Sequence, residues 1–199
     1  MGRTHLGKLV DEYVIGCETL RGLSNNAVIF GSARTAPTNE YYMLAYQLAR
    51  VLGCLGYNVI TGGGPGIMEA ANKGAYGTES NSIGLNLELP FEQTHNAYQD
   101  ISLNHHSFST RKAMFFRNTD MYFVLPGGDG TLDELFEART LMICGKIKMA
   151  PIVLIGSEYW EYLVTWMREV PCKYGTITAE TGFDMIYICL LYTSDAADE

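Results

Sequence analysis

Residues 125–134 read Leu-Pro-Gly-Gly-Asp-Gly-Thr-Leu-Asp-Glu and follow an apolar run that begins at Met121. Proline and glycine end this run abruptly, and an amphipathic segment begins at Thr131. The order predicts a strand, a tight turn and the first turn of a helix. Glycine lets bare backbone approach a ligand, and a helix start presents unpaired N–H groups to an anion. We therefore expect a phosphate-binding loop with the carboxylate of Glu134 directly behind it.

The alternation of apolar runs and helical patterns continues along the chain on both sides of this stretch. It predicts strands over residues 27–30, 57–61, 82–87, 121–125, 151–155 and 183–188, and helices over residues 6–20, 40–53, 67–75, 107–118, 132–144 and 159–168. Such alternation is typical of an α/β, Rossmann-like, doubly wound and mostly parallel sheet with helices on both faces. Right-handed crossovers bring the loops that follow strands to one edge, where ligands bind.

Composition narrows the class of protein. The 199-residue chain is 47% hydrophobic, which suits one compact domain that we place at residues 1–188. The formal charge of −8 argues against nucleic acid and anionic membranes as partners. No apolar stretch reaches the roughly 18 residues of a membrane span, and residues 1–9 are too polar for a secretory signal. The five cysteines lack metal-ligand spacing, so we expect no metal site and reduced thiols in the cytoplasm.

The final residues 189–199 read Cys-Leu-Leu-Tyr-Thr-Ser-Asp-Ala-Ala-Asp-Glu and look foreign to the rest of the chain. They resemble a translated sequencing adapter, and we expect the natural sequence to diverge near Ile188. The alternative is a genuine, frayed polar terminus. In either case we assign no function to this segment.

A second glycine-rich loop at residues 62–66 (Gly-Gly-Gly-Pro-Gly) precedes the helical pattern over Ile67–Ala75. It is not a Walker A loop, because lysine and Ser/Thr are missing from the required places, and its glycines do not fit G-x-G-x-x-G. Two interpretations stay open for this loop. Its backbone approaches a ligand, or the loop is a tight turn that needs glycine for geometry alone.

Arg111 and Lys112 fall in the first turn of the predicted helix over residues 107–118, where each cation opposes the helix dipole by roughly 0.3–1 kcal/mol. A bound anion would relieve this cost, and Arg111 suits bidentate recognition of phosphate or carboxylate. The alternative is that the helix begins earlier and both side chains are solvated. Thr131 and Glu134 also have a structural alternative, because Thr-x-x-Glu is a capping box.

Three segments together carry a family resemblance: residues 62–75 (GGGPGIMEAANKGA), residues 110–112 (Thr-Arg-Lys) and residues 126–134 (PGGDGTLDE). With them the chain resembles, over about residues 7–188, the Lonely Guy family of cytokinin riboside 5′-monophosphate phosphoribohydrolases, many of which were labelled lysine decarboxylases. Asp129 departs from the family pattern, which often has an aromatic residue there. This departure bears on packing of the base or of a partner subunit, not on the phosphate loop.

The resemblance implies hydrolysis of the N-glycosidic bond of a nucleoside 5′-monophosphate, AMP or an N6-modified AMP, to free base and ribose 5-phosphate. Glu134 would stabilise the oxocarbenium-like charge, bind ribose hydroxyls and orient water, and Arg111 would position the nucleotide and assist the departing base. The residues implied in binding the nucleotide and its 5′-phosphate are Ser32, Gly63, Gly64, Lys112, Gly128, Gly130 and Thr131. The resemblance also implies no metal or organic cofactor, and a homodimer with the site at the subunit interface.

Two other functions compete with this one. The first is a non-catalytic carrier of a nucleotide or phosphorylated cofactor, because molybdenum-cofactor carrier proteins resemble the same fold. The presence of both Arg111 and Glu134 argues against a carrier. The second is a dinucleotide-binding oxidoreductase with Glu88 as a ribose ligand, which the glycine spacing disfavours.

Overall fold

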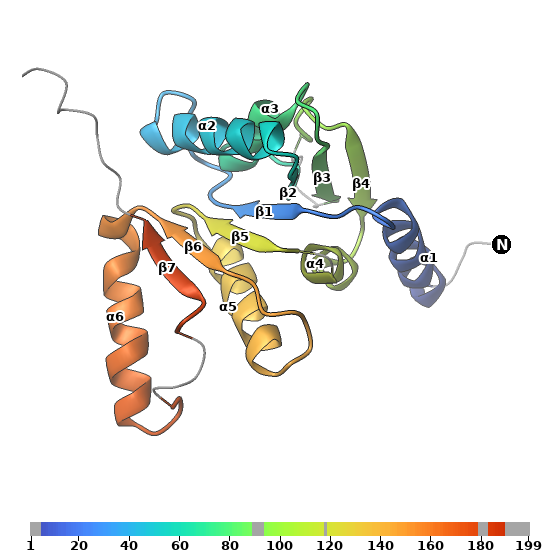
Figure 1. Cartoon of the computed structure of the whole chain (residues 1–199). Helices are drawn as coiled ribbons and strands as arrows, with labels where there is room; N and C mark the ends of the chain where they lie inside the picture. The colour runs from blue at the N-terminus through green and yellow to red at the C-terminus, as the bar shows by residue number, and fades with distance from the viewer. Residues whose placement is uncertain (1–4, 89–93, 118, 179–182, 190–199) are drawn as a thin grey trace, which may run out of the picture.

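The computed structural model describes residues 5–88, 94–117, 119–178 and 183–189. The described chain forms one sheet of seven strands in the order β4-β3-β2-β1-β5-β6-β7, with helices on both faces (Figure 1). The strands are β1 (Asn26–Phe30), β2 (Asn58–Thr61), β3 (Ser82–Leu87), β4 (Ile101–His105), β5 (Met121–Val124), β6 (Ile152–Ile155) and β7 (Ile186–Cys189). The helices are α1 (His5–Thr19), α2 (Glu40–Cys54), α3 (Ile67–Ala75), α4 (Phe108–Arg117), α5 (Asp129–Ile143) and α6 (Ser157–Lys173). The predicted α/β, Rossmann-like fold is confirmed.

Strand order reverses beside β1, at the centre of the sheet. Ala27 of β1 pairs with Val59 of β2 on one side and with Met121 of β5 on the other, and both pairings are parallel. The chain therefore builds outward from β1 to β4 and then returns to add β5, β6 and β7 on the opposite side. In doubly wound sheets this reversal opens a crevice beyond the carboxyl ends of the strands. The loops after β1 and β5 border that crevice.

Two hydrophobic clusters hold the helices against the sheet. One cluster joins the sheet to α2 and α3 through small residues such as Ala45, Ala49 and Ala71, which let these helices pack closely. The other joins the opposite face to α4, α5 and α6 through Phe115, Leu135 and Trp160, all nearly inaccessible to solvent. Figure 1 shows α2 and α3 above the sheet, with α4 and α5 below it. Among the described residues, no helix combines the length and apolar character that a bilayer crossing requires.

Most predicted elements match the structure, and three differences bear on the sheet, on the glycine-rich loop and on the predicted end of the domain. Strand β4 was not predicted, because its sequence offers only Ile101 and Leu103 as apolar residues. Helix α5 begins at Asp129 rather than at residue 132, so the glycine-rich loop before it is shorter than expected. Strand β7 extends to Cys189, which pairs with Ile155, so the predicted boundary at residue 188 falls inside a strand. The remainder of the predicted tail, 190–199, lies outside the described residues.

The turn from β2 to α3 brings Gly66 against the loop that follows β1. Gly66 has a φ of +68°, and a Cβ placed on it would lie 2.7 Å from the carbonyl carbon of Ala33 and within clashing distance of the Ser32 carbonyl oxygen. The amide N–H of the next residue, Ile67, donates a hydrogen bond of 3.0 Å to that same Ser32 oxygen. Glycine at this position therefore permits the backbone contact that holds the two loops together.

This contact predicts that Gly66→Ala destabilises the protein much more than a glycine substitution with the same backbone handicap in open space. Gly77 is the matched control, because its φ is +74° and a Cβ added to it would have no neighbour within 4 Å. Both variants lose about 1–3 kcal/mol to backbone strain, and Gly66→Ala loses a further 1–3 kcal/mol, roughly, to crowding. Urea unfolding of both variants measures the difference. Equal losses in the two variants would contradict this account of the loop contact.

Candidate active site

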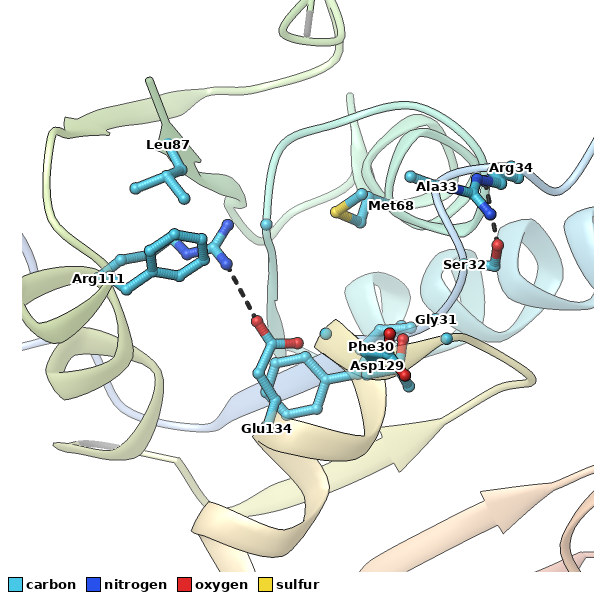
Figure 2. A pocket seen from close by; sticks show the side chains of 16 residues that line it. Phe30, Gly31, Ser32, Ala33, Arg34, Met68, Leu87, Arg111, Asp129 and Glu134 are labelled. Carbon is cyan, nitrogen blue, oxygen red and sulfur yellow. Dashed lines mark hydrogen bonds and ion pairs between the residues drawn. The ribbon is translucent and has the colours of Figure 1, made fainter. Parts of the chain in front are cut away.

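A cavity of about 420 Å³ lies at the reversal of strand order, in the size range of small-molecule sites (Figure 2). Its walls come from the end of β1, the loops after β1, β2 and β5, the end of β3, and the first turns of α4 and α5. Lining residues from these elements include Ser32, Gly62, Leu87, Arg111, Gly128 and Glu134. Segments far apart in sequence thus converge on one hollow, as the parallel topology requires.

Arg111 from α4 and Glu134 from α5 point toward one another and form an ion pair in the wall of this cavity (Figure 2). Nη2 of Arg111 lies 3.2 Å from Oε1 of Glu134, and the two side chains are only 14% and 12% exposed. The structure therefore brings together the two residues predicted to act on the substrate. It also shows that a carboxylate of the protein itself relieves part of the cost of placing Arg111 in the first turns of α4.

Aromatic rings surround the guanidinium of Arg111. Its Cζ lies 5.4 Å from the ring centre of Phe108 and 5.6 Å from that of Phe115, three residues before and four residues after it on α4. Burial lowers the pKa of Arg111, and the neighbouring carboxylate of Glu134 opposes that effect. Its Nε is buried without a hydrogen-bond partner among the described residues. The guanidinium is therefore held between two aromatic rings, and the described residues leave one of its N–H groups unsatisfied.

Burial dominates the electrostatics of Glu134. It raises the pKa of this carboxyl to about 7, although the guanidinium of Arg111 favours the ionised form. Asp133 and Glu137 add repulsion, and Lys112 adds a smaller attraction. A carboxyl that titrates near neutral pH can hold or release a proton under physiological conditions, and such groups concentrate at functional sites.

The start of α5 presents backbone to the cavity. Gly128 is the N-cap residue and caps no N–H group with a side chain, and a Cβ on Gly128 or Gly130 would meet no atom within 4 Å. The capping-box alternative for Thr131 and Glu134 is therefore wrong, because the helix begins before Thr131 and Glu134 faces Arg111 instead. The Thr131 side chain packs closely against Gly127. Free helix N–H groups beside open space suit an anion.

Ser32 forms the facing wall, in the loop after β1. Its Oγ accepts a 3.0 Å hydrogen bond from the backbone N–H of Arg34, and its own N–H donates to the carbonyl oxygen of Pro126 at 3.1 Å. Arg34 is solvent-exposed and lines the same cavity. The predicted Ser32, Gly128, Gly130 and Thr131 all line the cavity, and Arg34 adds a cation that was not predicted there.

Gly63 and Gly64 do not line the cavity with the other predicted residues. The carbonyl oxygen of Gly63 accepts from the Asn96 N–H at 2.9 Å and from Nε2 of Gln99 at 3.1 Å, and that of Gly64 accepts from Nδ2 of Asn96 at 3.0 Å. The loop is thus bound to residues 96–99. Gly63 has a φ of +71°, which favours glycine, and Gly62 is the loop residue that lines the cavity. A role of Gly63 and Gly64 in binding the nucleotide stays a prediction.

Lys112 also lies apart from the cavity lining. Its Nζ is paired with the carboxylates of Asp133 and Glu137, the latter at 2.8 Å. Successive residues of a helix point in different directions, so Lys112 cannot share the cavity-facing direction of Arg111. Its charge is already balanced by α5, and its role in nucleotide binding stays a prediction.

Several apolar lining residues were not predicted from sequence. Met68, Leu87 and Phe108 line the cavity, and Asp129 lines it beside the helix start. The spacing of Phe108, Arg111 and Phe115 along one helix face was a usable signal for the aromatic surround, since residues three and four apart are neighbours. Within the described ranges, no group of three or more His, Cys, Asp or Glu residues could hold a metal ion.

Because the carboxyl of Glu134 is buried, we predict that the stability of Glu134→Gln relative to wild type increases as pH rises. Because folding raises the pKa of Glu134 from 4.5 to about 7, its contribution to wild-type stability is complete below pH 4.5 and is lost as pH rises to 7. The amide does not titrate, so the variant should gain about 3 kcal/mol relative to wild type between acid and mildly alkaline solution. Urea unfolding across this range measures the gain, with Glu137→Gln as the control on the more exposed side of α5. A difference that stays constant with pH would refute the buried, titrating carboxyl.

Comparison with known proteins identifies the family of the chain. The family model described as "Possible lysine decarboxylase" matches residues 68–189. A probable cytokinin riboside 5′-monophosphate phosphoribohydrolase from Oryza sativa subsp. japonica is 31% identical over 149 residues, which span 71% of this chain and 68% of that protein. A cytokinin riboside 5′-monophosphate phosphoribohydrolase from Rhodococcoides fascians is 25% identical over 166 residues, spanning 81% of this chain and 82% of that protein.

Among solved structures, the molybdenum cofactor binding protein from Rippkaea orientalis superimposes with a TM-score of 0.58 at 20% identity, over 85% of this chain and 91% of that one. This likeness concerns the fold. The family match covers more than half of the sequence, including α4, α5 and the paired Arg111 and Glu134. The chain therefore belongs to the Lonely Guy family, whose model carries the lysine decarboxylase description.

Proposed function

We propose that this protein is a nucleoside 5′-monophosphate phosphoribohydrolase that acts on AMP or an N6-modified AMP. Water adds to C1′ of the ribose while the bond from C1′ to the base nitrogen breaks, and the products are the free base and ribose 5-phosphate. The observation that carries this proposal is the buried pair of Arg111 and Glu134 in a cavity that also contains an open helix start. The names of the relatives support the same reaction.

Glu134 is the proposed catalytic carboxylate. Cleavage of a glycosidic bond develops positive charge on the sugar, which a nearby carboxylate stabilises. A carboxyl with a pKa near 7 is also able to accept a proton from the attacking water. Arg111 holds the carboxylate in place through its Nη2 group, and we assign to its guanidinium the positioning of the nucleotide and assistance to the leaving base.

The 5′-phosphate is proposed to bind at the start of α5. Gly128 and Gly130 leave the backbone N–H groups open, and Thr131 adds its hydroxyl at the same end. Ser32 closes the other side of the cavity, and the exposed Arg34 supplies positive charge at its edge. This arrangement leaves the sugar between the phosphate site and the carboxylate of Glu134.

We do not propose a lysine decarboxylase activity, although the matching family model carries that description. Pyridoxal-phosphate enzymes hold their cofactor through a lysine amine in the active site. Lys112 is the lysine next to Arg111, and its amine is paired with Asp133 and Glu137 rather than directed at the cavity.

We further propose a homodimer with the site near the subunit interface. Helix α1 exposes Leu6, Val10 and Val14 at 69%, 53% and 45%, and these residues form an apolar face beside α4. Phe108, at the cavity wall, is also 54% exposed. A second copy would cover both surfaces, and a monomer at micromolar concentration in sedimentation equilibrium would contradict this.

The thiols of Cys17, Cys54, Cys144 and Cys172, none in a disulfide, support a cytoplasmic location, which cell fractionation tests.

A carrier of a phosphorylated cofactor is the second candidate. The molybdenum cofactor binding protein from Rippkaea orientalis and the carrier protein from Chlamydomonas reinhardtii share the fold, the latter at a TM-score of 0.56 and 18% identity. A carrier would bind its ligand tightly and release it unchanged. The same assay that tests the hydrolase distinguishes the two functions.

The deciding experiment incubates the protein with AMP, N6-isopentenyl-AMP and other nucleoside monophosphates, and measures free base by chromatography. We expect base release by the wild type. Glu134→Gln should lower kcat by about a thousandfold or more, because the amide can neither stabilise the sugar cation nor accept a proton. Glu137→Gln, on the same helix but outside the cavity, should retain activity near the wild-type level.

Two results would overturn the proposal. Tight binding without base release from any monophosphate would favour the carrier. Full activity of a correctly folded Glu134→Gln protein would assign the chemistry to another carboxylate.

A further inference from the structure

Helix α1 carries a buried carboxylate, Glu12, on the side that packs against the sheet. Its side chain is 8% exposed, whereas the outward face of the same helix is apolar and solvent-exposed. Burying a carboxylate is costly unless donors satisfy it. The partners of Glu12 therefore show what the carboxylate does.

Those partners all belong to the junction between β4 and α4. Oε2 of Glu12 accepts a 2.6 Å hydrogen bond from the hydroxyl of Thr110. Oε1 accepts from the backbone N–H of His106 at 3.1 Å and lies 2.9 Å from Nδ1 of the same residue. Thr110 directly precedes Arg111 in the chain. The carboxylate of Glu12 thus binds the residues that immediately precede Arg111 in the chain.

The network continues to the end of β3, which lies beside Arg111 in the cavity wall (Figure 2). Nε2 of His106 lies 3.0 Å from Oε2 of Glu88, which follows the cavity residue Leu87 at the end of β3. Glu12 is therefore linked through His106 to two parts of the site. Burial alone would raise the pKa of Glu12, but the hydrogen bonds from Thr110 and His106 outweigh burial and lower it, so the group is ionised at neutral pH.

From these contacts we infer that Glu12 is a positioning residue, which holds the first turn of α4 so that the Arg111 guanidinium stays against Glu134. The inference rests on the proposed hydrolase function for its kinetic consequence. The predicted effect on geometry does not depend on that function, because the distance between Nη2 of Arg111 and Oε1 of Glu134 depends on the position of the first turn of α4. A displacement of about 1 Å at a reacting group can cost roughly a hundredfold in rate.

The alternative is that Glu12 only fastens α1 to the body of the protein. Helices α1 and α4 also meet through Gly16, where the thioether of Met114 takes the place that a larger residue would need. A purely structural role predicts a loss of stability alone. A positioning role predicts effects that pass through Arg111 and Glu134.

Thr110→Val tests the inference, because it removes the hydroxyl that binds Glu12 while keeping the shape of the side chain. Thr119→Val is the matched control. Thr119 is also buried and its hydroxyl donates to the Phe115 carbonyl at the other end of α4, but it has no contact with Glu12. Each hydroxyl has two oxygen neighbours: the Thr110 hydroxyl lies near Glu12 and the Ser107 carbonyl, and the Thr119 hydroxyl lies near the Phe115 carbonyl and the Tyr122 hydroxyl. The two variants therefore remove comparable groups, and Thr110→Val alone removes a contact with Glu12. Glu12→Ala removes all of the carboxylate's contacts with Thr110 and His106 and serves as a second variant, for which the same rise in the Glu134 pKa is expected.

The first measurement is an NMR titration of the Glu134 carboxyl, identified by its absence in Glu134→Gln. Arg111 lowers the pKa of Glu134, so a displaced guanidinium should raise that pKa, by roughly one pH unit, in Thr110→Val and not in Thr119→Val. An unchanged Glu134 pKa in Thr110→Val would overturn the inference. This measurement needs no substrate, so it decides the geometry even if the protein releases no base.

The second measurement is the kinetics of base release. Thr110→Val should lower kcat about tenfold or more with little change in KM, and it should cause no further loss in an Arg111→Ala background. An equal fractional loss in both backgrounds would mean that Thr110 acts independently of Arg111, and the positioning role would then be rejected.

Discussion

The site depends on the burial of an ion pair between helices that the chain does not join directly. Arg111 and Glu134 are both more than four-fifths shielded from solvent, so each charge relies on the other and on the shape of the surrounding wall. Removing one partner from a buried pair leaves an uncompensated charge, which costs far more than the pair contributes. The elements around the pair therefore hold the two side chains in contact. Phe108 and Phe115 exclude water from the guanidinium, and the network around Glu12 fixes the start of α4.

Glycine has several distinct roles around this pair. Gly62 leaves room for the side chains beside it, because a Cβ there would lie 2.8 Å from Sδ of Met68 and 3.5 Å from Nη1 of Arg111. Gly66 permits contact between the loops after β1 and β2. Gly128 and Gly130 meet no protein atom where a side chain would begin, so they leave open space at the helix start. Glycine therefore serves both close packing and open space within the same site.

Sequence reasoning predicted the fold from regular patterns, whereas the joint role of Arg111 and Glu134 was implied by the family resemblance. Apolar runs identify strands, and parallel topology brings the loop before α5, and with it Glu134, to the ligand edge of the sheet. Arg111 follows β4, a strand that the apolar pattern did not predict. Lys112 could not be placed in this way. Its partners, Asp133 and Glu137, lie on a helix whose orientation against α4 is set by tertiary packing.

The same limit explains the other differences. Gly63 and Gly64 are bound by residues 96–99, a contact between segments that carry no regular pattern. Strand β4 lies at the sheet edge with only alternate residues buried, so its apolar signal is short. His105 and His106, adjacent in sequence, separate in the structure into a buried ring at the end of β4 and a half-exposed ring that joins two carboxylates. Local sequence does not specify such partners.

The most direct test of the account is a crystal structure of Glu134→Gln soaked with AMP, since this variant should bind the nucleotide without cleaving it. The account predicts the 5′-phosphate at the backbone N–H groups of Gly128–Thr131, and C1′ of the ribose in contact with the side chain at position 134. A phosphate bound elsewhere, or a ribose with C1′ directed away from position 134 and from Arg111, would contradict it.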